Sequence, residues 1–354
     1  MKTLRCNRSW TRVLLLSLFI LTAVTLRVEA QVTIQLVSAR DHIEGSFTTP
    51  QSIYADRDRI YLASFQGKLF VLARDRAANF PVIEVVQDTT APLTAVRGDS
   101  KNLYVTSVDG NLRVYRKEDP LVLIDTISLS GFGLSSVAPE GNSIYVSRGQ
   151  ASLAVDRNHV YLSELNEGDI GLEIGKRTLT PELTFGETFE PNTTIVFDRR
   201  TGDRVGGITN PPLLGGGLGV VSLYADKTIL ALTTPGCCGL GIFIYDPDTL
   251  TLDQAIGRHF TNTVVRSDSW LIAGNEGGQV DVFDLGQNPS PLISTVDLRL
   301  LTGHTGIEDI EIRALWKDKV DDLVFAGSSW GNDQSRGPTL PSFFVLELVK
   351  RKQR

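Results

Sequence analysis

Two adjacent cysteines, Cys237 and Cys238, stand between Gly236 and Gly239 and have the most unusual chemistry in the sequence. Cα atoms across a trans peptide lie about 3.8 Å apart, which is less than the usual disulfide span of about 4.4–6.8 Å. A bond between these sulfur atoms therefore requires a twisted or cis peptide, and strained disulfides are the more easily reduced ones. The pair has three interpretations: a vicinal disulfide that stiffens a loop, a ligand-contacting or redox ring, and two thiolates for a soft metal.

Three segments interrupt the pattern of short strands, at positions 166–192, 235–239 and 328–337. Loops of this length in compact folds usually carry function, and the alternative is that they are tolerated insertions. We therefore predict a loop-rich face that binds a ligand. Its candidate contacts combine an aromatic ring with charged and amide groups: Glu187, Trp330, Asn332, Asp333 and Arg336.

Residue spacing gives no motif for catalysis or for a transition metal. The four histidines are scattered, without the H-x-H or H-E-x-x-H spacing of metal sites, so we expect surface or packing roles: His42, His159, His259 and His304. Acidic residues cluster at 198–203 and 246–249, where the accompanying Pro and Gly are typical of turns. The sequence therefore leaves the catalytic residues unassigned.

The sequence contains a repeat of about 43 residues, and the strands of this repeat must position the cysteines and loops named above. Four residues of one copy recur 43 positions later: Tyr61, Gly67, Leu69 and Val71 as Tyr104, Gly110, Leu112 and Val114. Each copy reads as four short strands separated by Gly, Asp and Asn turns, which is the pattern of an antiparallel meander. Four-stranded repeats of about 40–50 residues indicate the blades of a β-propeller, and helical periodicity is nearly absent.

The number of blades depends on how residues 132–210 are divided. Tyr145 lies 41 residues after Tyr104, and about two further periods fit before Ile229, which favours seven blades. Local similarity instead makes Ala151–Leu165 the start of a blade whose third strand is Thr194–Asp198, which gives six. We predict a single all-β propeller of four-stranded antiparallel blades, with seven blades favoured over six.

The two ends of the repeat region predict how the ring closes. Val32–Val37 is an extra strand before the first repeat, and the last repeat has three strands, ending at Phe343–Leu348. Pairing the N-terminal strand with the last blade would cover both sheet edges. The propeller domain is then 31–349, followed by a basic tail at 350–354.

Residues 1–30 are predicted to be a cleavable signal peptide. A basic start precedes the apolar stretch Val13–Leu26, and Val28 and Ala30 occupy the positions that signal peptidase reads. The stretch is shorter than the roughly 20 residues of a membrane-spanning helix; the alternative is an uncleaved signal anchor. Cleavage after Ala30 predicts a secreted or periplasmic protein, in a compartment where disulfides persist.

The charge of the chain limits its partners. The predicted signal peptide carries five basic residues and one acidic residue, so its removal changes the net charge from −6 to about −10. An acidic surface argues against nucleic acid and anionic membranes as partners. We expect a protein, a glycan or a small molecule as the partner, no transmembrane segment after cleavage, and a monomer.

Two segments carry a resemblance to known repeat families. Leu103–Ser107 with Gly110–Tyr115 resembles the YVTN-type repeat, and Ile195–Gly202 resembles NHL and quinoprotein-like repeats. The resemblance extends at superfamily level over nearly all of 31–349. Such propellers include surface-layer proteins, adhesins, lactonases, lyases and quinone-dependent dehydrogenases, so the resemblance implies a fold rather than one activity.

Particular members of these families imply particular cofactors. A lactonase-like member would hold Ca²⁺ in the central channel with Asp, Glu and Asn from several blades, and such convergence leaves no spacing signature. Quinone-dependent alcohol dehydrogenases carry a vicinal cysteine pair beside their cofactor. This sequence lacks their repeated Trp-docking motifs, because the part after residue 30 has three tryptophans: Trp270, Trp316 and Trp330.

The sequence therefore supports two main functional hypotheses. The first is an exported binding or interaction module that uses the loop-rich face. The alternative is an extracytoplasmic enzyme, hydrolase (lactonase-like) or oxidoreductase, with a site in the central funnel near Cys237 and Cys238. A structural repeat of the cell surface is a third interpretation.

Overall fold

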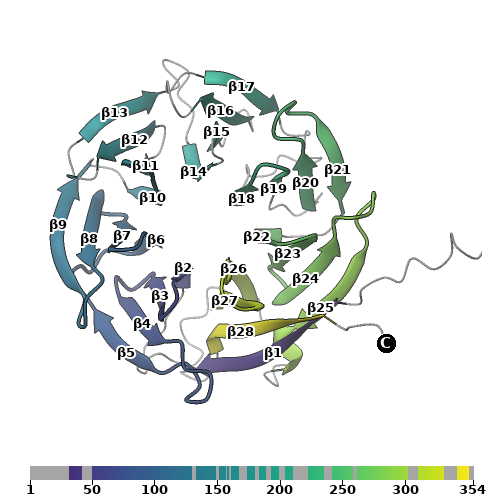
Figure 1. Cartoon of the computed structure of the whole chain (residues 1–354), viewed down its shortest axis with the longest axis horizontal. Helices are drawn as coiled ribbons and strands as arrows, with labels where there is room; N and C mark the ends of the chain where they lie inside the picture. The colour runs from purple at the N-terminus through teal and green to yellow at the C-terminus, as the bar shows by residue number, and fades with distance from the viewer. Residues whose placement is uncertain are drawn as a thin grey trace, which may run out of the picture.

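The described residues form seven four-stranded antiparallel sheets arranged as a ring around a central axis (Figure 1). The computed structural model describes fifteen parts of the chain: 32–41, 50–129, 133–148, 151–156, 158, 161–166, 174–179, 183–188, 193–198, 204–209, 222–234, 241–257, 261–301, 310–330 and 341–350. The predicted all-β fold of repeated four-stranded sheets is confirmed, and the arrangement is propeller-like.

Six sheets are built from four strands that follow one another in the chain, with the first strand nearest the centre in Figure 1. The first and second sheets contain β2 (Pro50–Ala55), β3 (Arg59–Ser64), β4 (Leu69–Ala73) and β5 (Val82–Val86), then β6 (Leu93–Gly98), β7 (Asn102–Ser107), β8 (Asn111–Arg116) and β9 (Val122–Ser128). The third and fourth contain β10 (Leu134–Glu140), β11 (Ser143–Arg148), β12 (Ala151–Asp156) and β13 (Tyr161–Asn166), then β14 (Ile174–Leu179), β15 (Leu183–Thr188), β16 (Thr193–Asp198) and β17 (Arg204–Thr209). The fifth and sixth contain β18 (Ser222–Ala225), β19 (Leu230–Thr234), β20 (Gly241–Tyr245) and β21 (Leu252–Ile256), then β22 (Thr261–Ser267), β23 (Trp270–Asn275), β24 (Gln279–Asp284) and β25 (Leu292–Asp297). One short helix, α2 (Leu298–Leu301), follows the sixth sheet.

The seventh sheet joins the two ends of the chain. Its strands are β26 (Ile310–Lys317), β27 (Leu323–Trp330) and β28 (Pro341–Lys350), and its outer strand is β1 (Val32–Asp41). β1 runs antiparallel to β28, with Ile34 opposite Leu348. This pairing confirms the predicted closure by the N-terminal strand.

The predicted loop over 166–192 is wrong, because this segment contains β14 and β15, the first two strands of the fourth sheet. Their sequences, IGKRTL and LTFGET, lack the apolar alternation from which strands are recognised. Backbone pairing with the apolar strand β16 identifies them instead. The six-blade division is also wrong, because Ala151–Asp156 and Tyr161–Asn166 are the third and fourth strands of a sheet rather than the start of one.

Apolar side chains fill the space between neighbouring sheets. Middle strands such as β3, β7 and β20 are almost wholly buried, because both of their faces are covered. At the contact between the sixth and seventh sheets, Ile272 and Val282 pack in one cluster with Ile312 and Val324. A glycine lets these two sheets approach closely: a Cβ on Gly274 would lie 2.5 Å from Cγ2 of Ile312.

We expect Gly274→Ala to destabilise the protein by about 1–3 kcal/mol, the usual cost of overpacking a core. The added methyl group would also lie 2.8 Å from Cβ of Ile312, so the two sheets would have to separate. Gly257→Ala is the control: no atom lies within 4 Å of its added Cβ, and its effect should stay within about 0.5 kcal/mol. Urea denaturation measures both variants, and equal stabilities would contradict this packing.

Aspartates fix the turn between the first and second strands of several sheets. Oδ1 of Asp56 accepts hydrogen bonds from the backbone N–H groups of Asp58 and Arg59, at 3.1 and 3.0 Å. The same two contacts recur at Asp99 and Asp226. An aspartate that binds the backbone two and three residues ahead favours a tight turn. In the turn between the third and fourth strands, Asp246 does the same, which confirms the turn predicted at 246–249.

Asp109, between β7 and β8, should make the stability of the protein depend on pH in the acidic range. Partial burial alone would raise its pKa, but hydrogen bonds from Arg113, Ser107 and Asn111 outweigh burial and hold the pKa well below its ordinary value. A carboxylate whose pKa is lower in the folded state stabilises the fold above its unfolded pKa of about 4, and this contribution is lost as the pH falls below that value.

We expect Asp109→Asn to lower the free energy of unfolding at pH 7 by about 1–3 kcal/mol, because Arg113 loses its charged acceptor. Between about pH 4 and 2 the wild-type protein should lose stability more steeply than the variant. Asp58→Asn, at an exposed position in a turn, serves as the control and should leave the pH profile unchanged. Identical profiles for the wild type and Asp109→Asn would contradict the assignment.

Candidate functional site

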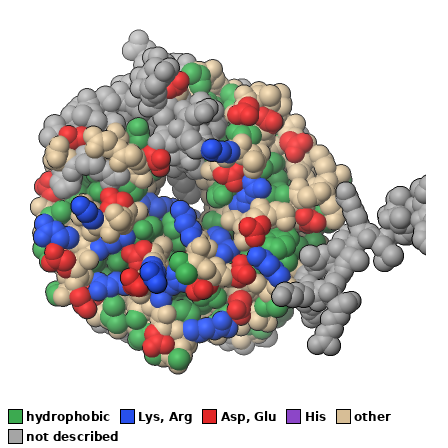
Figure 2. Space-filling view, viewed as in Figure 1, with side chains coloured by type: hydrophobic (Ala, Val, Ile, Leu, Met, Phe, Trp, Pro, Cys, Tyr) green, Lys and Arg blue, Asp and Glu red, His purple; other side chains and the backbone are tan. Residues whose placement is uncertain are grey.

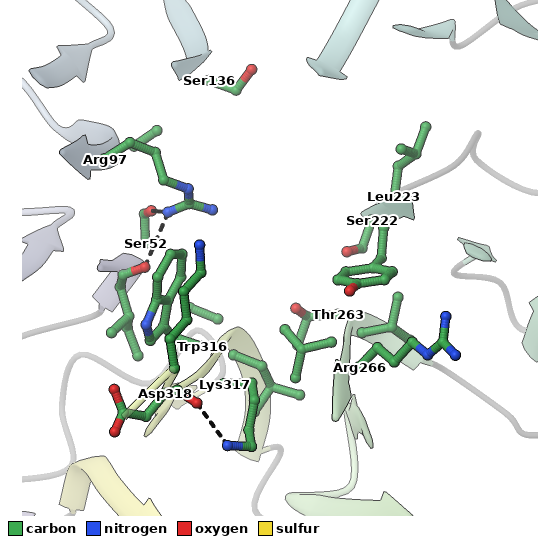
Figure 3. A pocket seen from close by; sticks show the side chains of 18 of the residues that line it. Ser52, Arg97, Ser136, Ser222, Leu223, Thr263, Arg266, Trp316, Lys317 and Asp318 are labelled. Carbon is green, nitrogen blue, oxygen red and sulfur yellow. Dashed lines mark hydrogen bonds between the residues drawn. The ribbon is translucent and has the colours of Figure 1, made fainter. Parts of the chain in front are cut away.

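A cavity of about 920 Å³ occupies the centre of the ring (Figure 3). Among the described residues, six first strands (β2, β6, β10, β18, β22 and β26) line it, together with the turn that follows β26. Figure 2 shows Lys and Arg side chains gathered around the hollow at the centre of the ring. The volume lies within the range of small-molecule sites, about 300–1,000 Å³.

The same position on the first strand lines the cavity in several sheets, and we call this position one level of the wall. In five sheets, the residue two positions before the acidic residue of the first turn lines the cavity: Arg97, Ala138, Tyr224, Arg266 and Trp316. Because the turns hold these strands in equivalent positions, the five side chains surround one space. Two guanidinium groups and two aromatic rings thus face the cavity from four different sheets.

Arg97 is held so that part of its charge faces the cavity. Its Nη1 donates hydrogen bonds to Oγ of Ser52 at 3.0 Å and to the carbonyl oxygens of Ile53 and Val96 at 3.0 and 2.7 Å. The guanidinium carbon lies 5.1 Å from the centre of the Trp316 ring, a distance at which a cation is attracted to the ring. These contacts use one nitrogen, and Figure 3 shows the other end of the guanidinium directed toward the open space.

The charge of Arg97 has no carboxylate partner within the described parts of the chain. Burial away from water lowers the pKa of the guanidinium to about 10, so the group stays charged at neutral pH. A cation held in a low-dielectric wall attracts an anion more strongly than it would in water. The local geometry therefore favours a negatively charged ligand group beside Arg97.

Six other charged residues of the wall differ from Arg97 because each of them forms an ion pair. Four carboxylates form ion pairs of 2.6–3.2 Å with Arg74 and Lys350, two cations that do not line the cavity: Asp268, Asp318, Asp321 and Asp322. Arg266 and Arg313 each have a carboxylate partner as well, at 2.8 Å for Arg266. Each of these carboxylates thus has a cationic partner, whereas Arg97 has no carboxylate partner among the described residues.

Lys317 directs its charge at the backbone. Its Nζ donates hydrogen bonds to the carbonyl oxygens of Asp318 and Asp321, at 2.7 and 2.8 Å. Burial lowers the pKa of this amine. Lys317 therefore fixes the turn at the edge of the cavity.

Hydroxyl groups from five sheets line the same space: Ser52, Thr94, Ser136, Ser222 and Thr263. Contacts within a sheet orient some of them, such as the 2.9 Å hydrogen bond between the hydroxyls of Thr94 and Thr106. Figure 3 shows Ser222 and Thr263 across the open space from Arg97. The cavity thus offers hydroxyl donors and acceptors opposite a cation.

The structure places two of the predicted ligand contacts and leaves the others outside the described residues. Glu187 lies in β15, where it pairs with Thr194 of β16, and Trp330 ends β27, opposite Ile310. These strands belong to different sheets, the fourth and the seventh. Asn332, Asp333 and Arg336 lie outside the described residues.

The predicted signal peptide (1–30), the pair Cys237 and Cys238 and the tail after Lys350 also lie outside the described residues. Segments 235–240 and 331–340 join the second and third strands of their sheets, as predicted for the loop-rich face. The cavity instead reaches the turns between first and second strands, Asp268 and Asp318–Asp322. In an antiparallel meander these turns lie at the opposite face.

Within the parts of the chain that the structure describes, no group of three or more His, Cys, Asp or Glu side chains is arranged to hold a metal ion. The described ranges also contain no helix that is long and apolar enough to cross a membrane. The Ca²⁺ that a lactonase-like member would hold in the central channel therefore gains no set of ligands from these residues, and the cofactor stays unassigned.

Sequence reasoning missed the cavity and Arg97. One sequence signal could have indicated Arg97. At the position two residues before the turn aspartate, two repeats have Arg97 and Arg266 where two others have Tyr54 and Tyr224. A charged residue at a position that is aromatic in other repeats marks a side chain that does not pack in the core. Aligning the repeats identifies this position in each copy, but it does not show that the side chain points toward the centre of the ring.

No family model matches this sequence, and no curated protein matches it either. Of the expected resemblance, the structure therefore bears out the propeller-like arrangement of four-stranded antiparallel sheets.

Proposed function

We propose that this protein is an exported binding module that holds a small polar molecule in its central cavity. The cavity itself carries the proposal: about 920 Å³ of space at the centre of the ring, lined by first strands of six sheets. Rigid strands position binding groups more precisely than loops do. Export rests on the predicted signal peptide, and the loop-rich face remains a separate prediction.

A variant that fills the cavity tests this function. Ala138 lines the space on β10, so Ala138→Trp should block it. Monosaccharides and small organic acids, neutral and acidic, are screened by thermal shift and then by calorimetry. The matched control is Val122→Trp on the outer strand β9, where the side chain is exposed.

We expect at least one probe to bind the wild type and Val122→Trp, and to lose binding in Ala138→Trp. Unchanged binding in a folded Ala138→Trp variant, or no binding by any probe, would contradict the proposal. Chemical conversion of the bound probe would favour the enzyme alternative.

A further inference from the structure

We infer that the ligand of the central cavity is a hydroxylated carboxylic acid, such as a sugar acid, whose carboxylate binds to Arg97. This inference rests on the proposed function and specifies its ligand. The evidence is the geometry of Arg97, the pairing of the surrounding charges, and the composition of the wall opposite this residue.

The part of Arg97 that faces the cavity matches a carboxylate. Its Nη1 is used by Ser52 and two backbone carbonyls, which leaves Nη2 and Nε as donors. A guanidinium binds the two oxygens of a carboxylate through two parallel hydrogen bonds. The protein contacts hold the group in place before the ligand arrives, which reduces the entropy lost on binding.

The charge balance favours a ligand group with a single negative charge. Arg266 and Arg313 line the same cavity, but their carboxylate partners already neutralise them, and the amine of Lys317 is held by two backbone carbonyls. Lys319, on the turn at the edge, is exposed, so water and salt screen its charge. A phosphate dianion would therefore find one cation, Arg97, with two donor nitrogens still available.

The remaining wall favours a ligand that carries hydroxyl groups. Ser222 and Thr263 lie across the open space from Arg97 (Figure 3), and serine and threonine hydroxyls both donate and accept hydrogen bonds. Tyr224 and Trp316 add aromatic surface at the same level. The hydroxyls of the wall fit the hydroxyl-bearing edges of a sugar acid, the aromatic rings fit the face of its ring, and Arg97 fits its carboxylate.

The test compares four probes on the wild-type protein by calorimetry: D-glucuronate, its neutral amide D-glucuronamide, D-glucose and inorganic phosphate. D-glucuronate is expected to bind at least 10-fold more tightly than each of the other three. Because the amide differs from the acid at one group, this comparison measures the carboxylate contact without altering the fold.

Two variants then assign the contact to Arg97. Arg97→Gln should weaken D-glucuronate binding by about 10- to 100-fold, the range for a hydrogen bond to a charged group, and Arg97→Lys should recover only part of it because lysine cannot bind in a bidentate way. Arg116→Gln is the matched control: Arg116 ends β8 in the same sheet, lies outside the cavity, and forms an exposed pair with Glu118, so affinity should change less than threefold. Circular dichroism verifies that each variant is folded.

The outcomes separate this inference from the proposed function. If D-glucose or D-glucuronamide binds as tightly as D-glucuronate and Ala138→Trp blocks it, the cavity binds ligands but the carboxylate inference is wrong. Tighter binding of phosphate, or an Arg97→Gln effect no larger than that of Arg116→Gln, overturns the inference too. If no probe binds in the cavity, both proposals fail.

Discussion

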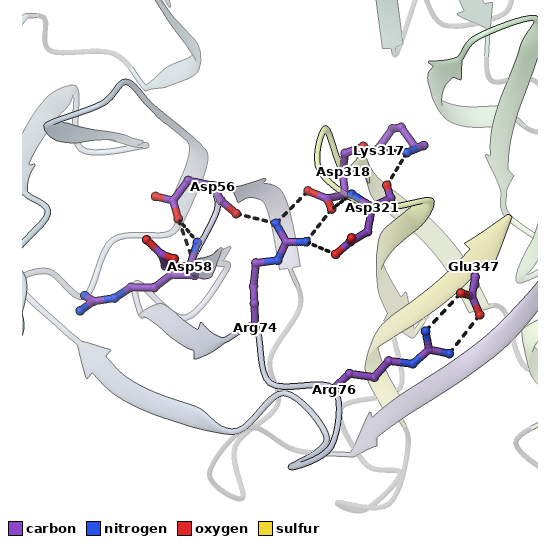
Figure 4. Close-up of polar contacts among 9 residues, drawn as sticks. Asp56, Asp58, Arg74, Arg76, Lys317, Asp318, Asp321 and Glu347 are labelled. Atoms are coloured by element: carbon purple, nitrogen blue, oxygen red, sulfur yellow. Dashed lines mark hydrogen bonds and ion pairs between the residues drawn. The ribbon is translucent and has the colours of Figure 1, made fainter.

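Replacing Arg74 with methionine is expected to lower the free energy of unfolding by about 3–5 kcal/mol, the usual cost of leaving one charge of a buried ion pair without its partner. Arg74 follows β4 in the first sheet and reaches the turn between β26 and β27 in the seventh (Figure 4). Its Nη1 and Nη2 contact the two carboxylate oxygens of Asp318 at 3.1 and 2.6 Å. The Asp318 side chain is 1 % exposed and that of Arg74 7 % exposed.

This ion pair connects the two sheets that meet where the ring closes. Nη1 of Arg74 also donates to the carbonyl oxygen of Asp56 at 2.7 Å, and Nη2 contacts Asp321 at 2.8 Å. Without the guanidinium, the buried carboxylate of Asp318 would lose both of these hydrogen bonds. The same turn forms part of the cavity wall, so the variant should also weaken ligand binding.

Arg76 offers a matched control. It also forms two hydrogen bonds with one carboxylate across the same pair of sheets, to Glu347 at 3.1 and 3.0 Å. Its side chain is 56 % exposed, and an exposed pair contributes about 0–1 kcal/mol. Arg76→Met should therefore have a small effect, and urea denaturation compares the two variants.

A second substitution tests the physical cause. If the loss comes from the buried charge of Asp318, then Asp318→Asn in the Arg74→Met background should recover part of the stability, because an amide costs less to bury than a carboxylate. An Arg74→Met variant no less stable than Arg76→Met would contradict the assignment, as would a double variant that is less stable than Arg74→Met.

The features that depend on local pattern could be predicted from the sequence. Tyr61 and Tyr104 recur at one spacing because each second strand must bury the same face against its neighbours, so the repeat, the four-stranded sheets and the closing strand were all visible. β14 and β15 were not visible, because pairing of backbone groups holds these polar segments rather than apolar side chains.

The candidate site depends on closure of the whole ring, which no local pattern encodes. Arg97 and Thr263 are 166 positions apart in the sequence and line the same cavity because their sheets surround one axis. Among the described residues, the lack of a carboxylate partner for Arg97 is also a property of the assembled wall. The two cations that form ion pairs with its acidic residues, Arg74 and Lys350, come from outside the cavity.

Removal of β1 is expected to have the other large effect. Val32 and Ile34 are 0 % and 6 % exposed and belong to the apolar cluster between the sixth and seventh sheets. Each such side chain contributes about 1.5–3 kcal/mol when buried. A protein that begins after residue 41 should therefore lose about 3–6 kcal/mol from these two side chains alone, a large part of the 5–15 kcal/mol typical of a folded domain.

The same deletion would expose the backbone of β28. β1 covers this strand from Lys350 to Pro341, and an uncovered edge strand pairs readily with other chains. We expect the shortened protein to melt at lower temperature and to associate, which denaturation and light scattering measure. A shortened protein that remains monomeric and as stable as the wild type would show that β1 does not close the ring.

A synthetic peptide of residues 31–41 distinguishes loss of the closing strand from general damage. Added in trans, it should pair with β28 as an extra strand, raise the melting temperature of the shortened protein and reduce its association. A scrambled peptide of the same composition should do neither, because its apolar residues would not face the cluster that holds Val32 and Ile34. The predicted signal cleavage after Ala30 leaves one residue before β1, so export would release the chain with its closing strand complete.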